Sequence, residues 1–313
     1  MIRKAAATRK AVVIANASVD ETYAVASLPR PGESMIGTFL ARDLGGKGAN
    51  VAMVLARAGV ATTLVAAVGD DDRGAFVRSR LAAEPLTTSL VPAAELPTDL
   101  SIIYATPDGD NAIVTTVAAT RKLEVVHANA VMDTLAARDL VVLQGNLERE
   151  VSFALIEAAR RRNLVIALNP SPLLPWLADA ISRVQIVFAN EAEAEELTGE
   201  GGDAAVQALL ASGAEQVIVT RGAAGSVLGT RHGSNDKHGD FRLVTVAAES
   251  IEVVDTTGAG DTFMAVALAS AARRGVSIDE VALMHATRAA AITVSRRGTA
   301  SAFPDTHELD VLW

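Results

Sequence analysis

Short apolar runs alternate with longer helical patterns from Leu140 onward, and this alternation constrains the fold more than any other feature of the chain. A short apolar run bounded by turn residues predicts a buried strand, and strand–helix units at this spacing are typical of a parallel sheet covered by helices. We therefore expect an α/β fold. The expected strands are Leu140–Leu143, Leu164–Leu168, Val184–Ala189 and Gln216–Thr220, and the expected helices are Val151–Arg162, Glu191–Thr198, Ala204–Ser212 and Thr262–Ala272.

Polar residues and glycines directly follow each of the expected strands. In an open α/β sheet these positions line the edge formed by the carboxyl ends of the strands, which is where ligands bind. The sequence therefore predicts a ligand site along one edge of the sheet. The residues concerned are Gln144-Gly145-Asn146, Asn169–Pro172, Asn190-Glu191 and Thr220-Arg221-Gly222.

A loop of small residues, Gly258, Ala259 and Gly260, leads through Asp261 into an apolar helical run. Such a loop at a helix start exposes backbone N–H groups, which bind anions together with the helix dipole. A carboxylate there would repel a bound phosphate, so Asp261 indicates a base that takes the proton of a hydroxyl attacking that phosphate. The alternative is an aspartate that only caps an ordinary glycine turn.

The composition argues against several classes of partner. The 313 residues are half apolar, carry a formal net charge of −9 and include no cysteine. An acidic surface repels nucleic acid and anionic membranes, so we expect neither as a partner. The lack of cysteine excludes disulfides and is consistent with the reducing cytoplasm, where we expect the protein to reside. No apolar run reaches the ~18 residues that a membrane span needs.

Residues 1–10 are basic and alanine-rich, and we interpret them as a solvated tail before a domain that covers residues 11–313. Two segments of this domain interrupt the α/β pattern. Residues 21–44 contain two prolines, and residues 100–117 read as two strand-like arms around a turn. We expect both segments to contribute strands to a small second sheet. The polar stretch 233–239 is expected to be a mobile surface loop.

Two strings together resemble the signatures of the ribokinase-like (PfkB) carbohydrate kinases. One is GGKGANVA at 45–52, which leads into an expected helix Val51–Ala58, and the other is DTTGAGDTF at 255–263. The resemblance covers residues 11–304, and the first string matches ribokinases best. It implies a Rossmann-like parallel sheet flanked by helices, with a small β lid built from the two interrupting segments. It also implies ATP-dependent transfer of the γ-phosphoryl group to a primary hydroxyl of a sugar, ribose or a related pentose, and a homodimer formed through the lid.

The resemblance implies a sugar-binding role for Asp20, which is expected to follow the first strand, Ala11–Ala15, by a short turn and to accept hydrogen bonds from two sugar hydroxyls. Ser18 stands where relatives often have Asn, and Asn146 stands where ribokinases have a Glu that contacts the sugar. We therefore expect a changed pattern of hydroxyl recognition. Each residue could instead have a purely structural or solvated role, as a turn residue, a helix cap or a solvated amine. The other implied sugar contacts are Gly46, Lys47, Asn50 and Asp261.

The resemblance also implies a nucleotide site on the later strands. There Arg221 would add positive charge near the phosphates, and the Asn190-x-x-Glu193 motif would orient water around Mg²⁺. Without the resemblance, this motif reads as a capped helix start. Two further loops match those that bind a monovalent cation such as K⁺. The implied nucleotide contacts are Asn190, Thr220, Gly222, Gly225 and Thr287, the last in a helix expected to start near His285; the implied metal contacts are Glu193 for Mg²⁺ and Asp255, Thr257 and Gly298 for K⁺.

Several alternatives stay open at this point. A nucleoside kinase or a hexose or phosphosugar kinase of the same family would share both strings. A catalytically inactive ligand sensor would be expected to have lost Asp261, the glycines before it or the Asn190/Glu193 pair, all of which are present. A nucleic-acid binder of the same fold is disfavoured by the negative charge.

Overall fold

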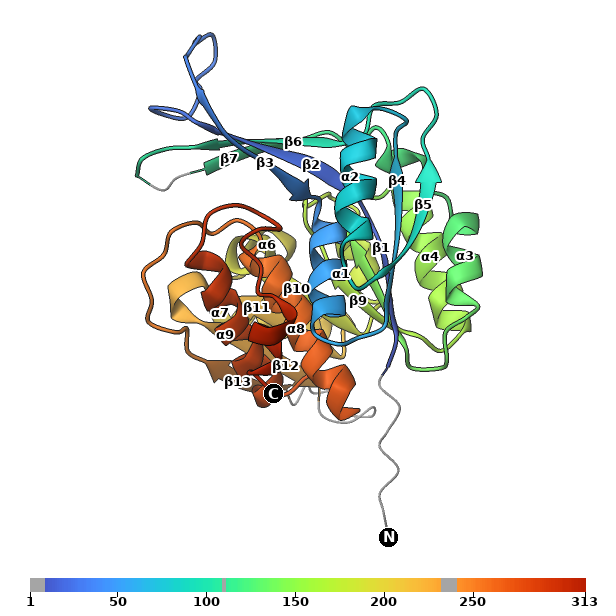
Figure 1. Cartoon of the computed structure of the whole chain (residues 1–313). Coiled ribbons are helices and arrows are strands. Elements are labelled where there is room, and N and C mark those ends of the chain that lie inside the picture. Colours follow the sequence, from blue (N-terminus) through green and yellow to red (C-terminus); the bar gives the residue numbers. More distant parts are fainter. Residues whose placement is uncertain (1–8, 109–110, 232–240) are drawn as a thin grey trace.

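The computed structural model describes residues 9–108, 111–231 and 241–313, and its helices pack on both faces of a central sheet (Figure 1). The large sheet has nine strands in the order β13-β12-β11-β10-β9-β8-β1-β4-β5. Its strands are β1 (Ala11–Ile14), β4 (Thr62–Val68), β5 (Thr87–Pro92), β8 (Leu140–Gln144), β9 (Val165–Asn169), β10 (Ile186–Asn190), β11 (Gln216–Thr220), β12 (Ser226–Arg231) and β13 (Phe241–Val246).

All neighbouring strands from β5 to β11 pair in parallel, whereas β12 is antiparallel to both β11 and β13. This arrangement confirms the predicted α/β class with a parallel-dominated sheet flanked by helices. The helices are α1 (Lys47–Arg57), α2 (Asp72–Ala82), α3 (Val125–Met132), α4 (Arg149–Arg161), α5 (Leu177–Ile181), α6 (Glu191–Thr198), α7 (Gly202–Ala211), α8 (Ala259–Arg274), α9 (Glu280–Val294) and α10 (Thr306–Asp310).

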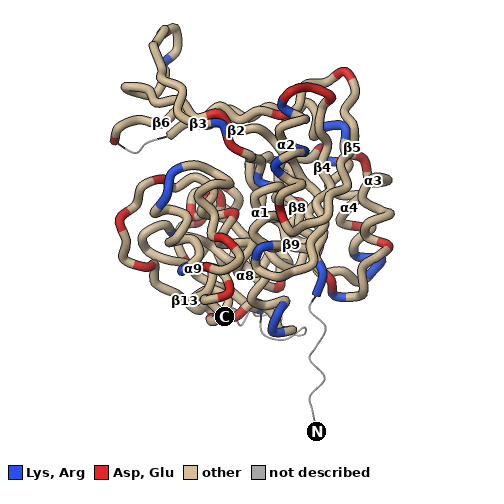
Figure 2. The backbone as a smooth tube through the Cα atoms, viewed as in Figure 1, with Lys and Arg blue, Asp and Glu red and all other residues tan. Residues whose placement is uncertain are grey.

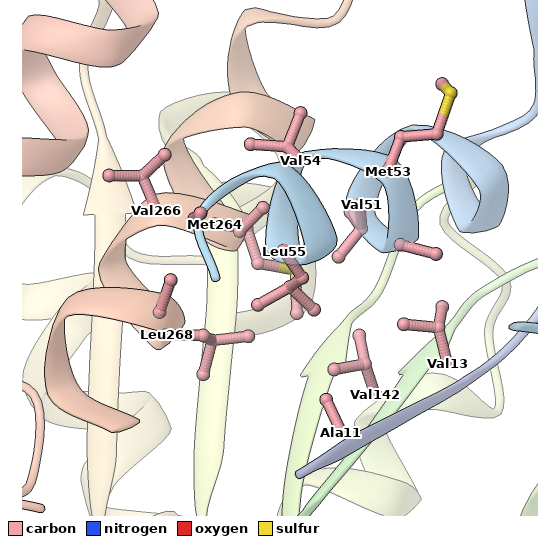
Figure 3. Packing of buried hydrophobic residues seen from close by; sticks show 14 of the residues in the cluster. Ala11, Val13, Val51, Met53, Val54, Leu55, Val142, Met264, Val266 and Leu268 are labelled. Atoms are coloured by element: carbon pink, nitrogen blue, oxygen red, sulfur yellow. The ribbon is translucent and has the colours of Figure 1, made fainter. Parts of the chain in front are cut away.

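The core has two layers, one on each face of the sheet. Alternate residues of β1 point to opposite faces, so Val13 belongs to the cluster with α1, α2, α8 and α9, and Val12 belongs to the cluster with α3 to α7. Figure 3 shows side chains of α1 and α8, among them Leu55 and Met264, meeting each other above the sheet residues Val13 and Val142. This packing fixes the start of α1 beside the start of α8.

A second, four-stranded sheet in the order β3-β2-β6-β7 projects from the body at one end (Figure 1). Its strands come from the segments that interrupt the α/β pattern. They are β2 (Ser18–Ala24), β3 (Thr38–Gly45), β6 (Leu100–Ala105) and β7 (Asn111–Thr115).

Asp20 follows β1 after a short irregular segment, as predicted, and it lies within β2. Two local predictions were wrong. Helices α1 and α8 begin earlier than predicted, because the first turn of a helix accepts glycine as readily as a loop does. Lys47, Asn50 and Asp261 therefore stand in first helical turns. Thr287 lies in the middle of α9 rather than near its start.

The first residues of the expected tail and the expected loop 233–239 lie outside the described residues. Within the described ranges, every helix falls short of the length and apolar character that a membrane span requires. Basic and acidic residues are interspersed along the backbone that Figure 2 traces.

The packing of α1 against α8 yields a test of the core. Leu55 is fully buried between these helices and the sheet, so Leu55→Ala should lower the free energy of unfolding by about 2–5 kcal/mol. Urea unfolding followed by circular dichroism measures this change. Val281→Ala, at a side chain that is 42% exposed, serves as the control and should change stability by about 0.5 kcal/mol or less. Equal effects of the two substitutions would contradict the assigned core.

Candidate active site

Asp261 is a buried carboxylate that joins α8 to α1. It stands in the first turn of α8 and is only 5% exposed. Asn50 Nδ2 donates to its Oδ2 at 2.8 Å, and Lys47 Nζ lies 3.6 Å from its Oδ1. Both partners come from the first turn of α1, within the glycine-rich string. The two strings that were recognised separately in the sequence therefore meet at this one carboxylate.

The start of α8 presents free backbone donors beside Asp261. The helix is capped by Gly258, whose φ of 75° lies in the left-handed region that favours glycine. Among the residues that the structure describes, the N–H groups of Gly258, Gly260 and Asp261 have no intramolecular acceptor. These donors and the positive end of the helix dipole form a place where an anion can bind.

A cavity of about 520 Å³ lies next to this helix start. It is formed by the loop after β11, the segment between β13 and α8, the start of α8 and the second half of α9. Its lining includes Gly260, which directly precedes Asp261 in the chain. A ligand in this cavity would therefore place its charged end at the donors of α8. Four residues with implied nucleotide roles line it together: Thr220, Gly222, Gly225 and Thr287.

Thr287 brings a buried hydroxyl to the cavity that has no hydrogen-bond partner in the described part of the chain. A buried polar group without a partner is costly, so this hydroxyl is available to a ligand. Arg221 behaves differently from the prediction. It pairs with Asp203 at 2.8 Å and lies 3.9 Å from Glu191, so its charge is compensated by carboxylates and does not face the cavity as a free cation.

Asn190 and Glu193 form a reciprocal capping box at the start of α6. Asn190 Oδ1 accepts the N–H of Glu193, and Glu193 Oε2 accepts the N–H of Asn190. This is the capped helix start that the motif indicates without the family resemblance. One carboxylate oxygen of Glu193 and the side-chain amide nitrogen of Asn190 are not used in the box. The described residues contain no group of three His, Cys, Asp or Glu side chains arranged to hold a metal ion.

Asp20 is a second buried carboxylate, and it is 5% exposed. Burial raises the pKa of Asp20 to about 6; hydrogen bonds from the hydroxyls of Thr299, Ser101 and Ser18 oppose this rise, and the nearby charge of Asp43 adds to it. Thr299 donates to one carboxylate oxygen at 3.0 Å and Ser18 to the other at 3.1 Å. Asp20 therefore exchanges its proton close to neutral pH, unlike an ordinary aspartate.

Ser18 is fully buried beneath Asp20. Because its hydroxyl is donated to that carboxylate, we expect it to act through Asp20 rather than by touching a ligand. Gly45, in the neighbouring strand β3, lies against the same carboxylate: a Cβ at this position would come within 1.9 Å of Asp20. Gly46 has a φ of 89° and turns the chain from β3 into α1. Gly45 thus makes room for Asp20, and Gly46 makes room for the backbone of residues 16–18.

Asn146 follows β8 and is 7% exposed. Its amide nitrogen donates to Asn16 Oδ1, and its own oxygen is buried without a partner in the described part of the chain. Asn16 lies two residues after β1, the strand next to β8. The ends of these two strands therefore meet at the edge where the polar residues were predicted to gather.

Asp255 connects the two loops with implied cation-binding roles. Its carboxylate accepts the N–H of Thr257 at 2.9 Å and the N–H of Gly298 at 3.3 Å. Both oxygens are therefore engaged by backbone donors. Any cation in this place would depend largely on backbone carbonyls.

Two residues of the site were missed in the sequence. Asn16 follows a buried strand directly, which is the same signal that selected Asn146 and Asn190, but it was not applied to the first strand. Thr299 contacts Asp20 across 279 positions of sequence, and no local pattern marks it.

Together, the free donors of α8, the buried carboxylate beside them and the adjoining cavity suit a reaction in which a hydroxyl attacks a bound phosphate. Fold and site thus define a phosphotransferase with an alcohol acceptor. The model of the pfkB family of carbohydrate kinases matches residues 8–306, and the chain belongs to this family. It is accordingly an ATP-dependent sugar kinase.

Curated relatives span nearly the whole chain. The ribokinase of Bacillus subtilis (strain 168) is 30% identical over 304 residues, which is 97% of this chain and 99% of the relative. A deoxyribokinase of Salmonella typhi is 27% identical over 306 residues, or 95% and 96% of the two chains. The crystal structure of a ribokinase from Thermotoga maritima superposes with a TM-score of 0.83 at 25% identity and covers 97% of this chain and 99% of its own. These similarities confirm the family resemblance and the fold class.

The hydroxyl donors around Asp20 yield a test of the site's electrostatics. Thr299→Val removes a hydrogen bond that favours the carboxylate, so the pKa of Asp20 should rise further above its value of about 6. The pH dependence of the Asp20 carboxyl-carbon NMR signal measures it. Thr293→Val, which removes a buried hydroxyl that contacts Thr262 instead, is the matched control. An unchanged titration in the Thr299 variant would contradict the contact.

Proposed function

We propose that this kinase transfers the γ-phosphoryl group of ATP to a primary hydroxyl of a pentose, with ribose as the first candidate. The relatives described above include a ribokinase and a deoxyribokinase, and both names specify a pentose as acceptor. Hexoses, phosphosugars and nucleosides remain the alternatives that an experiment must separate from pentoses.

One observation supports the proposal above all others. Gly260 lines the 520 Å³ cavity, and Asp261, the next residue, contacts the α1 residues Asn50 and Lys47. A phosphate held at the start of α8 and a hydroxyl held near α1 would therefore meet at one carboxylate. Phosphoryl transfer needs this adjacency, because its catalysis consists mainly of positioning and electrostatic stabilisation.

The proposed mechanism assigns each step to residues of this chain. The nucleotide occupies the cavity beside Thr287, and its phosphates accept hydrogen bonds from the N–H groups of α8. The Asp261 carboxylate takes the proton of the sugar hydroxyl as the hydroxyl oxygen attacks the γ-phosphorus and the bond to the β-phosphate breaks. Asn50 holds the carboxylate in orientation, and the Lys47 ammonium offsets the negative charge that gathers there.

Two metal ions belong to the proposal. Mg²⁺ bound to the nucleotide would neutralise phosphate charge, and the unused oxygen of Glu193 suits contact through water, since Mg²⁺ retains most of its hydration shell. A hydrogen bond between Asp255 and Gly298 joins the loop before α8 to the loop after α9. A monovalent cation such as K⁺ would bind between these loops, mainly through backbone carbonyls. Thr257 belongs to the same loop pair. Activity with K⁺, Na⁺ or neither would decide this point.

The second sheet is the proposed lid and the proposed dimer interface. Large apolar side chains are exposed on this sheet and just before β3, and nothing in the described chain covers them. Phe39, Leu40, Ile113 and Val114 lie on the sheet, and Ile36 precedes β3. A second copy of the chain would bury such residues. We retain the cytoplasm as the proposed compartment, because the chain contains no cysteine.

A screen of acceptors tests the proposed function directly. Consumption of ATP with Mg²⁺ should be measured over pentoses, deoxypentoses, hexoses, phosphosugars and nucleosides, with and without K⁺. The proposal expects the highest kcat/KM for a pentose, because that ratio reports discrimination between acceptors. A higher value for a hexose or nucleoside would overturn the assignment of substrate but not that of the family.

The role of Asp261 predicts a specific loss of turnover. Asp261→Asn keeps the shape of the side chain but cannot accept the hydroxyl proton, so kcat should fall by ~10²–10⁴ while the KM for ATP changes little. Asp70→Asn, at a side chain that is 99% exposed, is the control and should leave kcat unchanged. A kcat near that of the wild type in the Asp261 variant would exclude its role as base.

The raised pKa of Asp20 predicts a pH-dependent affinity for sugar. The ionised carboxylate accepts hydrogen bonds through both oxygens, whereas protonation turns one oxygen into a donor, and the pKa of Asp20 is about 6. The KM for the sugar should therefore fall as the pH rises through about 6, while the KM for ATP should not follow this change. Asp20→Asn should raise the sugar KM and remove its pH dependence. If both substrates respond equally, the role of Asp20 is structural.

A further inference from the structure

Asn16 connects three elements at the edge of the large sheet. It follows β1 and is 3% exposed. Its side-chain oxygen accepts the N–H of Gly48 at 3.3 Å and also accepts from Asn146 Nδ2. Its backbone carbonyl accepts the N–H of Ala49 at 3.1 Å. The end of β1, the first turn of α1 and the segment after β8 are therefore held together by one residue.

These contacts determine which way each amide points. A backbone N–H can only donate, so the atom of Asn16 that faces Gly48 must be its oxygen. The Asn146 atom that faces the same oxygen must then be a donor, which is its amide nitrogen. The oxygen of Asn146 is left buried without a partner in the described residues. Asn16 thus turns Asn146 into a hydrogen-bond acceptor.

Asn50 shows the same pattern independently. Its amide nitrogen is donated to Asp261, and its oxygen is also buried without a partner in the part of the chain that the structure describes. A buried acceptor that lacks a donor costs about 1–3 kcal/mol, so two such oxygens indicate a ligand that donates. Asn16 holds the start of α1, on which Asn50 stands, and it also holds Asn146.

We propose that Asn16 is a positioning residue for sugar recognition, which fixes Asn146 as an acceptor for one sugar hydroxyl. The proposal rests on the proposed function, because it requires a sugar near Asn146. An amide has a donor end and an acceptor end, and without Asn16 the two ends of Asn146 could exchange places. With Asn16 present, Asn146 serves as a neutral substitute for a carboxylate at this position.

The test is a double-mutant cycle with carboxylate rescue. Asn16→Ala should raise the KM for ribose about tenfold, the typical worth of one hydrogen bond, and leave the KM for ATP unchanged. An aspartate at position 146 has two equivalent acceptor oxygens and needs no orienting partner. Asn16→Ala combined with Asn146→Asp should therefore recover most of the lost affinity for ribose.

The wild-type background supplies a test that needs no change at Asn16. There Asn146→Asp should raise the ribose KM, because the new carboxylate faces the oxygen of Asn16, and two acceptors repel each other. The same substitution thus weakens binding with Asn16 present and strengthens it with alanine at that position. A merely structural Asn16 would not reverse this sign. Urea unfolding of each variant measures any separate loss of stability.

The outcomes separate this inference from the proposed function. If the wild type phosphorylates no pentose, the proposed function fails, and the cycle is then measured on the best acceptor of the screen. If a pentose is phosphorylated but Asn16→Ala leaves its KM unchanged, the positioning role is overturned while the function stands. Failure of Asn146→Asp to restore affinity in the Asn16→Ala background would overturn it as well.

Discussion

A carboxylate removed from water at the beginning of a helix is the constraint on which this site depends. Burying a charge is costly unless it is paired and hydrogen-bonded, and within the described residues Asp261 satisfies this condition through Asn50, Lys47 and the dipole of α8. The first turn of α1 must therefore lie beside that of α8. Glycine lets this first turn of α1 lie directly against the end of β1, because a Cβ on Gly48 would come within 2.5 Å of the Cβ of Ala15. The glycine-rich string is thus a requirement of packing as well as of ligand access.

Much of this arrangement could be predicted from the sequence, and the exceptions have physical reasons. The strand-then-polar-residue pattern located the carboxyl edge, and the register of the sheet places Gln144 beside Asn169 and Asn190 beside Thr220. Helix starts were misplaced, because glycines and small residues carry no decisive local preference between loop and first turn. Thr299 and the orientation of Asn146 depend on contacts across 279 and 130 positions, and local patterns contain no information about such contacts.

The loop after α9 donates hydrogen bonds to three carboxylates from different parts of the chain. Its residue 298 donates to Asp255, its residue 299 donates to Asp20, and its residue 301 donates to Asp43 at the base of the second sheet. Asp43 is also paired with Arg80 of α2 at 3.2 Å. A shift of this short loop would therefore be felt at both buried carboxylates of the second sheet and at the turn before α8. The loop therefore fixes the positions of these three carboxylates relative to one another.

The residues that line the cavity and the residues proposed to bind the sugar are encoded by different stretches of the gene. Residues 220–294 supply the whole lining of the cavity, whereas Asp20, Asn50 and Asn146 precede it in sequence and lie on other elements. Asp261 and the loop at 298–301 connect the two regions, in addition to the packing of α1 against α8. Mutations that alter the choice of sugar can therefore accumulate in the first half of the gene without changing the residues that line the proposed nucleotide cavity. Such modularity lets recombination or drift diversify acceptors while one inherited phosphate-handling unit is retained.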